Sequence, residues 1–396
     1  MIQNIYELGV KQAMKRWIVL VASIILQMIL GGIYAWSIFV PALNKNYNIN
    51  ASRSSLIFGI TILTFTIVMI YAGKVLARKG PRFTSLIGAS LYTVGYFIAS
   101  LSGGEYYLIL LGIGIVAGAG IGFGYVCPLT TCIKWFPKKK GLITGLAVGG
   151  FGGGAIILKE LVSILQNNGL DTLMIFRNIA IFTGIPAIIA AMLLSNPPGY
   201  KGEEDDGQKV SHLLKTRMII AMIIGMFSGT FGGLMVVSNI KQIGLSNNLV
   251  EYYAGLAISL FAVGNSLGRI IWGSIFDKFG KISIPISLLL LGGSSLTLLS
   301  GSPLLFNFGS IITGIAFGGC FVLYFLRIVE RYEDKAGELY PYVFLAYGIS
   351  AVLGPALGGS IYDMTGTYRL AIFGLLIITL IGSAAVYFME IKNNNV

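Results

Sequence analysis

The sequence predicts an all-α integral membrane protein of twelve transmembrane helices, arranged as two parallel six-helix repeats. Hydrophobic residues make up 55% of the 396 residues and charged residues only 11%, whereas soluble domains carry about 25% charged residues. Apolar stretches of about 20 residues, each long enough to cross the hydrocarbon core as a helix, recur along the chain. They lack the period-two alternation of barrel strands. In lipid, the backbone N–H and C=O groups must form their hydrogen bonds within the segment, so we predict helices.

The spans follow one another with short connections. Hydropathy places them at residues 17–43, 54–73, 83–102, 106–133, 141–165, 172–194, 217–239, 250–275, 282–301, 304–328, 340–362 and 367–390. The first stretch follows a polar start and precedes eleven further spans, so we expect a first transmembrane helix rather than a cleaved signal peptide.

Basic residues set the orientation. Lysine and arginine number 28 against 16 acidic residues, a net charge of +12. With both termini in the cytoplasm, 21 of the 28 fall in cytoplasmic segments and six outside, while Arg269 lies within a span. This asymmetry follows the positive-inside rule, so we expect both termini to be cytoplasmic and the lipid bilayer to be the partner. Nucleic-acid binding is not needed to explain the charge.

Two halves of the sequence resemble each other at an offset of about 200 residues. The stretch from Gly73 to Gly80 is matched by the stretch from Gly273 to Gly280, and a fixed offset across several spans indicates a duplication. We therefore predict an N-terminal bundle (1–195), a cytoplasmic linker (196–216) with an acidic run at 203–206, and a C-terminal bundle (217–396). The repeated motif, which we interpret as a conformational loop, comprises Gly73, Arg78, Gly80, Gly273, Asp277, Lys278 and Gly280.

The repeated Gly-x-x-x-Asp-Lys/Arg-x-Gly resembles the loop motif of the major facilitator superfamily, although Ala77 replaces the first aspartate. Four further motifs, at 31–37, 134–137, 196–198 and 231–233, resemble the oxalate/formate antiporter family, which includes lactate-type monocarboxylate carriers. The resemblance covers essentially the whole chain. It implies the major facilitator fold, secondary active transport by alternating access and a multi-pass protein of the plasma (cell) membrane.

Arg269 is the main candidate for substrate binding. A charge within a span costs at least about 2.5–3.5 kcal/mol, so it is normally functional or paired, and a guanidinium fits a carboxylate bidentately. Asn265 lies one turn earlier on the same face. The alternative is that Arg269, three residues before Trp272 at the expected inner interface, extends to the headgroups. The resemblance implies an arginine here as the substrate anchor, with a polar partner four residues before it.

The number of cations favours a monocarboxylate such as lactate, pyruvate, acetate or formate. A dicarboxylate such as oxalate would need a second cation in the site. The family's oxalate carrier has a lysine in the span that corresponds to 340–362, but here that span has no lysine or arginine. Lys159 and Glu160 lie near the outer end of span 141–165, and we interpret them as a pair at the membrane interface rather than as a second substrate-binding site. An oxalate:formate-type anion exchanger remains the alternative. The resemblance implies a cavity wall of Tyr34, Tyr125, Phe151, Phe317, Phe321 and Tyr347.

Other classes of protein fit less well. An intramembrane enzyme needs a nucleophile and a base or a metal, but the single histidine, His212, lies in the linker. We expect no catalytic residues, metal or cofactor, and we interpret Cys127, Cys132 and Cys320 as inert. A receptor or sensor using a transporter fold stays open. We expect proton coupling, with the proton carried either by the substrate carboxylate or through a site exposed only in transit, and function as a monomer.

Overall fold

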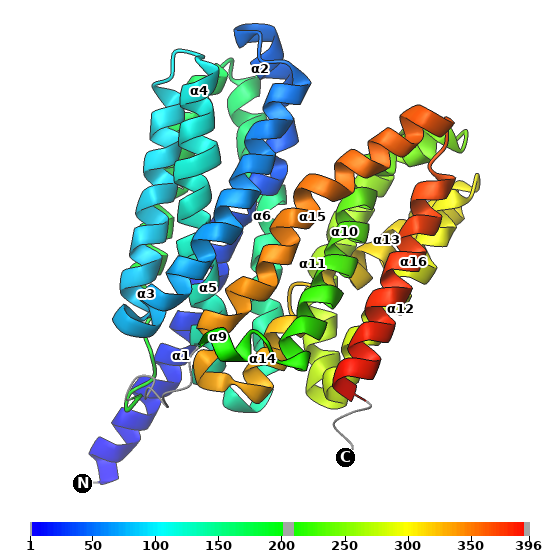
Figure 1. The fold of residues 1–396 in the computed structure, drawn as a ribbon. Coiled ribbons are helices and arrows are strands. Elements are labelled where there is room, and N and C mark those ends of the chain that lie inside the picture. Colours follow the sequence, from blue (N-terminus) through cyan, green and yellow to red (C-terminus); the bar gives the residue numbers. More distant parts are fainter. Residues whose placement is uncertain (1, 201–209, 392–396) are drawn as a thin grey trace. The chain divides into compact units, whose positions relative to one another are not determined.

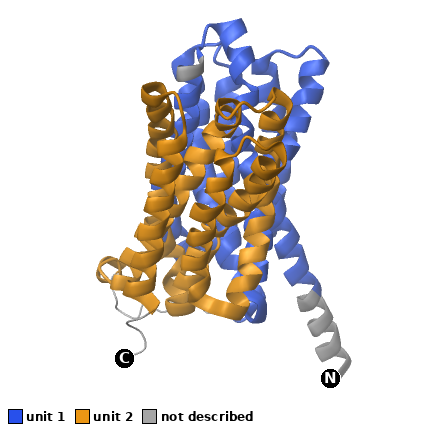
Figure 2. Ribbon diagram, turned by 90° about the vertical axis from the view of Figure 1, so that its right-hand side faces the viewer, with its two compact units in different colours: residues 1–204 blue, residues 205–396 orange. Residues whose placement is uncertain are grey.

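The structure is a computed structural model that describes residues 2–200 and 210–391. These residues form helices and no strand. The chain divides into two compact units, residues 1–204 (unit 1) and 205–396 (unit 2), shown in Figure 2. The division falls within the predicted linker, whose acidic run at 203–206 lies outside the described residues. The predicted domain boundaries stay a prediction.

Unit 1 holds the first six predicted spans, and α1 packs along α6 while α3 packs along α5. Its elements are α1 (Ile2–Gly31), η1 (Gly32–Ile38), α2 (Val40–Tyr47), α3 (Ala51–Ser100), α4 (Tyr106–Ile109), η2 (Leu110–Ala117), α5 (Gly118–Trp135), η3 (Pro137–Lys139), α6 (Lys140–Asn167), α7 (Thr172–Phe182) and α8 (Gly184–Leu193), labelled in part in Figure 1. The η2 segment is π-helical, so the helix that runs from α4 into α5 is locally wider than a regular α-helix.

Unit 2 holds the last six predicted spans, and α11 packs along α13 while α10 packs along α15. Its elements are α9 (Val210–Leu213), α10 (Arg217–Ser246), α11 (Glu251–Phe279), η4 (Gly280–Ile282), α12 (Ser283–Ser295), η5 (Leu296–Leu299), α13 (Pro303–Gly319), α14 (Leu323–Arg331), η6 (Glu333–Lys335), α15 (Ala336–Thr365), α16 (Arg369–Val386) and η7 (Tyr387–Ile391).

Ten helical stretches among the described residues are long and apolar enough to cross a membrane. Two of them, Arg53–Ser100 and Glu251–Leu299, are 48 and 49 residues long, about twice the length that one crossing needs. Each is interrupted at the glycine that closes the repeated motif, because Gly80 (φ 78°) and Gly280 (φ 58°) have positive φ, a conformation that glycine adopts without a Cβ penalty. Each therefore provides two spans, and the predicted twelve-helix fold is confirmed.

The helices extend beyond several predicted edges. The predicted second and eighth spans end at residues 73 and 275, whereas the helices continue to Lys79 and Phe279. Hydropathy falls where lysine and arginine begin, but these side chains favour helix, so the backbone continues past the apolar stretch. Other spans are broken internally, as at Thr183 between α7 and α8 and at 320–322 between α13 and α14.

A hydrogen-bonded contact joins α2 to the start of α7 in unit 1. Asp171 caps α7 by accepting from the Leu173 N–H (3.0 Å), and it also accepts from the Asn46 amide (3.1 Å) and the Tyr47 hydroxyl. Burial alone would raise the pKa of Asp171, but the hydrogen bonds from Tyr47, the N–H groups of Leu173 and Thr172, and Asn46 hold it below its usual value. The carboxylate therefore stays charged and fixes α2 against α7.

Candidate functional site

Arg269 lies on α11 where α11 and α13 cross with their backbones in contact. Glycines on both helices make this approach possible. A Cβ on Gly268 would lie 2.2 Å from the Ile315 carbonyl oxygen, and a Cβ on Gly318 would lie 2.5 Å from the Asn265 carbonyl oxygen. The crossing therefore holds the segment that carries Asn265 and Arg269 directly against α13.

The Arg269 guanidinium packs on an aromatic ring. Its Cζ lies 4.3 Å from the centroid of Phe321, and the side chain is 0% exposed. A desolvated contact of this kind is worth about 2 kcal/mol. Trp272, which we expected at the inner interface, is also buried, and its indole N–H donates to the Ile315 carbonyl (3.0 Å). Arg269 thus lies inside the protein and not in the exposed position that the alternative requires.

Further rings pack around Phe321 and, with Arg269, form the C-terminal cluster, defined here as Arg269, Phe317, Phe321, Phe344 and Tyr347. The Phe321 ring meets Phe317 at 5.1 Å and Tyr347 at 5.3 Å, and Phe344 meets Tyr347 at 5.1 Å. The structure therefore brings together the site residues that we predicted on spans 8, 10 and 11. Phe344 was missed, and its position one turn before Tyr347 on α15 was the available signal.

Asn265 lies one helical turn before Arg269 and is half-buried. Its amide oxygen is buried and accepts no hydrogen bond from the residues that the structure describes. This places a hydrogen-bonding group on the same helix as the guanidinium, at the spacing that puts both on one face.

The predicted residues of unit 1 form a second group of rings, the N-terminal cluster, defined as Tyr34, Phe65, Tyr125 and Phe151. Phe151 meets Tyr34 at 5.4 Å and Tyr125 at 5.1 Å, both edge to face. Phe65 of α3, which sequence reasoning missed, meets Tyr125 at 5.1 Å. Gly31 makes the cluster possible, because a Cβ there would lie 1.9 Å from the Phe151 carbonyl oxygen.

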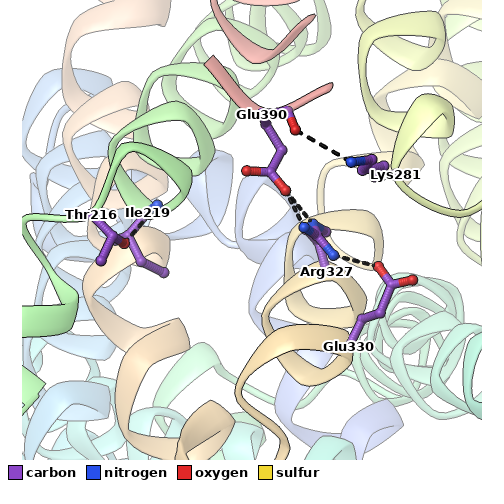
Figure 3. A network of polar contacts seen from close by, with 6 residues as sticks. All are labelled: Thr216, Ile219, Lys281, Arg327, Glu330 and Glu390. Carbon is purple, nitrogen blue, oxygen red and sulfur yellow. Dashed lines mark hydrogen bonds and ion pairs between the residues drawn. The ribbon is translucent and has the colours of Figure 1, made fainter. Parts of the chain in front are cut away.

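A buried charge network in unit 2 was also missed (Figure 3). Arg327 is only 8% exposed on α14, and its Nε donates to Glu390 Oε1 at 2.8 Å. Its Nη1 donates to Glu330 Oε2 at 2.7 Å, and the Lys281 ammonium donates to the Glu390 backbone carbonyl at 3.4 Å. Glu390, an acidic residue at the end of the last span, was the available signal.

Other chemistry has little support among the described residues. No group of three histidine, cysteine or acidic side chains there could hold a metal. Cys127, Cys132 and Cys320 are buried free thiols, and Lys159 and Glu160 are exposed on α6. Chemically, the C-terminal cluster offers one guanidinium on an apolar aromatic surface with an amide nearby, an arrangement suited to a small anion with an apolar body.

Three comparisons bear on the family. The family model described as Major Facilitator Superfamily matches residues 17–340 and 218–395. The uncharacterized MFS-type transporter YhjX of Escherichia coli (strain K12) is 26% identical, over 85% of this chain and 86% of YhjX. The oxalate:formate antiporter of Oxalobacter formigenes is 23% identical, over 87% and 85% of the two chains. The transporter FucP in the outward conformation is 14% identical, with a TM-score of 0.74 over 95% of this chain and 98% of FucP, a likeness of fold alone.

Proposed function

The chain belongs to the Major Facilitator Superfamily, and on that premise we propose that it is a secondary active transporter of a small monocarboxylate, of the lactate, pyruvate, acetate or formate type. The observation that carries the proposal is the buried Arg269 guanidinium on the Phe321 ring. A guanidinium keeps its charge and presents a planar fork of donors. The surrounding rings provide an apolar surface for the short carbon chain of such a substrate.

Charge balance favours one carboxylate on the substrate. Two arginines are buried among the described residues: Arg327 is paired with Glu390 and Glu330, and Arg269 contacts the face of the Phe321 ring. The predicted eleventh span, now α15, carries no lysine or arginine. A dicarboxylate would leave one charge in an apolar setting without a cation, which is costly. The likeness to the oxalate:formate antiporter makes oxalate:formate-type exchange the second candidate.

Coupling and orientation belong to the same proposal. Moving one uncompensated negative charge against an inside-negative potential costs about 2.3 kcal/mol per 100 mV. A proton that travels with the substrate carboxylate removes this cost. The placement of 21 of 28 basic residues in alternate connections supports cytoplasmic termini in the plasma membrane.

Ligand binding to the purified full-length protein tests the substrate class. We expect acetate or lactate to bind more tightly than oxalate, and Arg269→Met to weaken binding at least about 100-fold, or about 2.7 kcal/mol. Arg269→Lys keeps the charge but loses the fork, so we expect an intermediate loss. Arg369→Met, at an exposed arginine, is the control and should bind normally. Tighter binding of oxalate, or normal binding by Arg269→Met, contradicts the proposal.

Uptake into vesicles tests the coupling. We expect an acid-outside pH gradient to drive accumulation of the labelled monocarboxylate. Uptake that ignores the gradient and requires an anion inside the vesicles would instead establish exchange.

A further inference from the structure

Two aromatic rings and an arginine meet at the end of unit 1 where the apolar span of α1 begins. The Arg16 Cζ lies 5.5 Å from the centroid of the Trp17 ring and 5.6 Å from that of the Phe136 ring, and the two rings meet edge to face at 5.2 Å. Phe136 follows α5 directly and packs against the core residues Leu20 and Cys132. Phe136 therefore fixes this group of side chains to the bundle, while Arg16 and Trp17 are exposed.

Two lysines add charge beside these rings. Lys138 and Lys139 follow Phe136 in the short helix η3, where the Lys139 N–H donates to the Phe136 carbonyl at 3.1 Å. Both lysines and Arg16 are exposed, and none of the three is in an ion pair with another described residue. We call Arg16, Trp17, Phe136, Lys138 and Lys139 the α1–η3 cluster. It presents three positive charges that the described part of the chain does not neutralise.

An apolar strip on α1 begins next to the α1–η3 cluster. Ile18, Val21 and Ile25 are exposed, and spacings of three and four residues place them on one face of the helix. Trp17 lies one turn before Val21, between the charges and the strip, and tryptophan favours the headgroup level of a bilayer. A charged end that continues into an apolar face matches a phospholipid, in which headgroup and acyl chains are joined, better than it matches a free anion.

We propose that the α1–η3 cluster binds the headgroup of an anionic phospholipid, with an acyl chain lying along Ile18, Val21 and Ile25. The Arg16 guanidinium supplies a fork of donors that fits a phosphate, and the two lysines add attraction for a lipid of net negative charge. A zwitterionic lipid has the same phosphate, but its own cationic group would lie among three cations. The inference goes beyond the proposed function, because it concerns lipid and does not depend on the substrate.

Quenching of tryptophan fluorescence by bromine-labelled lipids tests the proposal on the full-length protein in phosphatidylcholine vesicles. We expect brominated phosphatidylglycerol to bind at least about 10-fold more tightly than brominated phosphatidylcholine. The signal should come from Trp17, since Trp36 and Trp272 are buried and Trp135 is half-buried. Trp17→Phe should therefore remove most of the selective quenching. Selective quenching that persists in Trp17→Phe would place the lipid elsewhere and overturn the proposal.

Charge variants separate this site from general attraction to a basic surface. We expect the double variant Lys138→Gln, Lys139→Gln to weaken phosphatidylglycerol binding at least about 10-fold, and Arg16→Gln to weaken it by a similar factor. The matched control is Lys74→Gln, Lys79→Gln, which removes the same charge from exposed lysines of α3 at the same end of unit 1. This control should bind phosphatidylglycerol as the wild-type protein does.

Three further results would overturn the proposal. Equal binding of the two lipids by the wild-type protein does so without any variant. An equal loss in the two double-lysine variants would show that only the overall charge of the surface matters. Displacement of phosphatidylglycerol by inorganic phosphate at the same concentration would show that the site binds phosphate alone and that the apolar strip contributes nothing.

Discussion

The position of residue 269 shows how one side chain can carry charge inside an apolar bundle. The guanidinium has lost contact with water but retains the face of Phe321 at 4.3 Å, and a ring face attracts a cation electrostatically. Phe317 lies on α13, and Cys320 and Phe321 follow directly after that helix. The same short stretch therefore provides both the ring that contacts the guanidinium and part of the apolar surface around that ring.

A double-mutant cycle should measure this contact. We expect Arg269→Met and Phe321→Leu to show a coupling free energy of about 0.5–2 kcal/mol in thermal or chemical unfolding. The control pairs Arg269→Met with Phe325→Leu, since Phe325 is equally buried but packs on Tyr340. Coupling that is the same in both cycles would show that the ring face contributes nothing specific.

At the scale of elements, small residues decide how closely the helices approach. Gly264 and Gly268 on α11 face α13, and Gly314 and Gly318 on α13 face α11, so that each helix lies against backbone atoms of the other. Such contacts leave no space for a side chain. Gly255 of α11, by contrast, has open surroundings.

Gly318→Ala and Gly255→Ala should change stability in opposite directions. The new methyl group at 318 would lie 2.5 Å from the Asn265 carbonyl oxygen and 2.9 Å from the Arg269 nitrogen, and overpacking of this kind costs about 1–3 kcal/mol. The methyl group at 255 meets nothing within 4 Å, so the variant gains up to about 1 kcal/mol of helix propensity. Unfolding midpoints of the two purified variants check the prediction, and equal shifts contradict it.

At the scale of the whole chain, hydropathy was enough to predict the twelve spans, because a stretch of about 20 apolar residues has few other solutions. The repeat offset predicted matching glycines, and both interrupt long helices at positive φ. The pairing of Arg327 with Glu390 could not be predicted, since the residues are 63 positions apart and hydropathy does not identify contacts. Phe65 was missed because, in an apolar span, a ring in a cluster has the same local pattern as a ring that faces lipid; for Phe344 the one available signal was its position one turn before Tyr347.

The Arg327 network should anchor the end of the described chain to the rest of unit 2, since it joins α14, η4 and η7 (Figure 3). Glu390→Gln leaves Arg327 buried without its full counter-charge, and we expect a loss of about 3–5 kcal/mol in the free energy of unfolding. The exposed pair Lys241–Glu251, with its atoms 2.7 Å apart, is the control. Glu251→Gln should change the unfolding midpoint little, because water screens that pair. Equal effects of the two variants would show that burial of the ion pair is irrelevant.

The π-helical η2 segment has a consequence for where Tyr125 lies. A π-turn takes more residues than an α-turn over a similar rise, so the chain between Leu110 and Ala117 contains surplus length. If the same residues were wound as a regular α-helix, each surplus residue would rotate everything before the segment by about 100° relative to α5. Either Gly112 would lose its close approach to Gly95, or Tyr125 would swing away from Phe65 and Phe151. The direction in which Tyr125 projects from α5 therefore depends on how many residues precede it as well as on which residues they are.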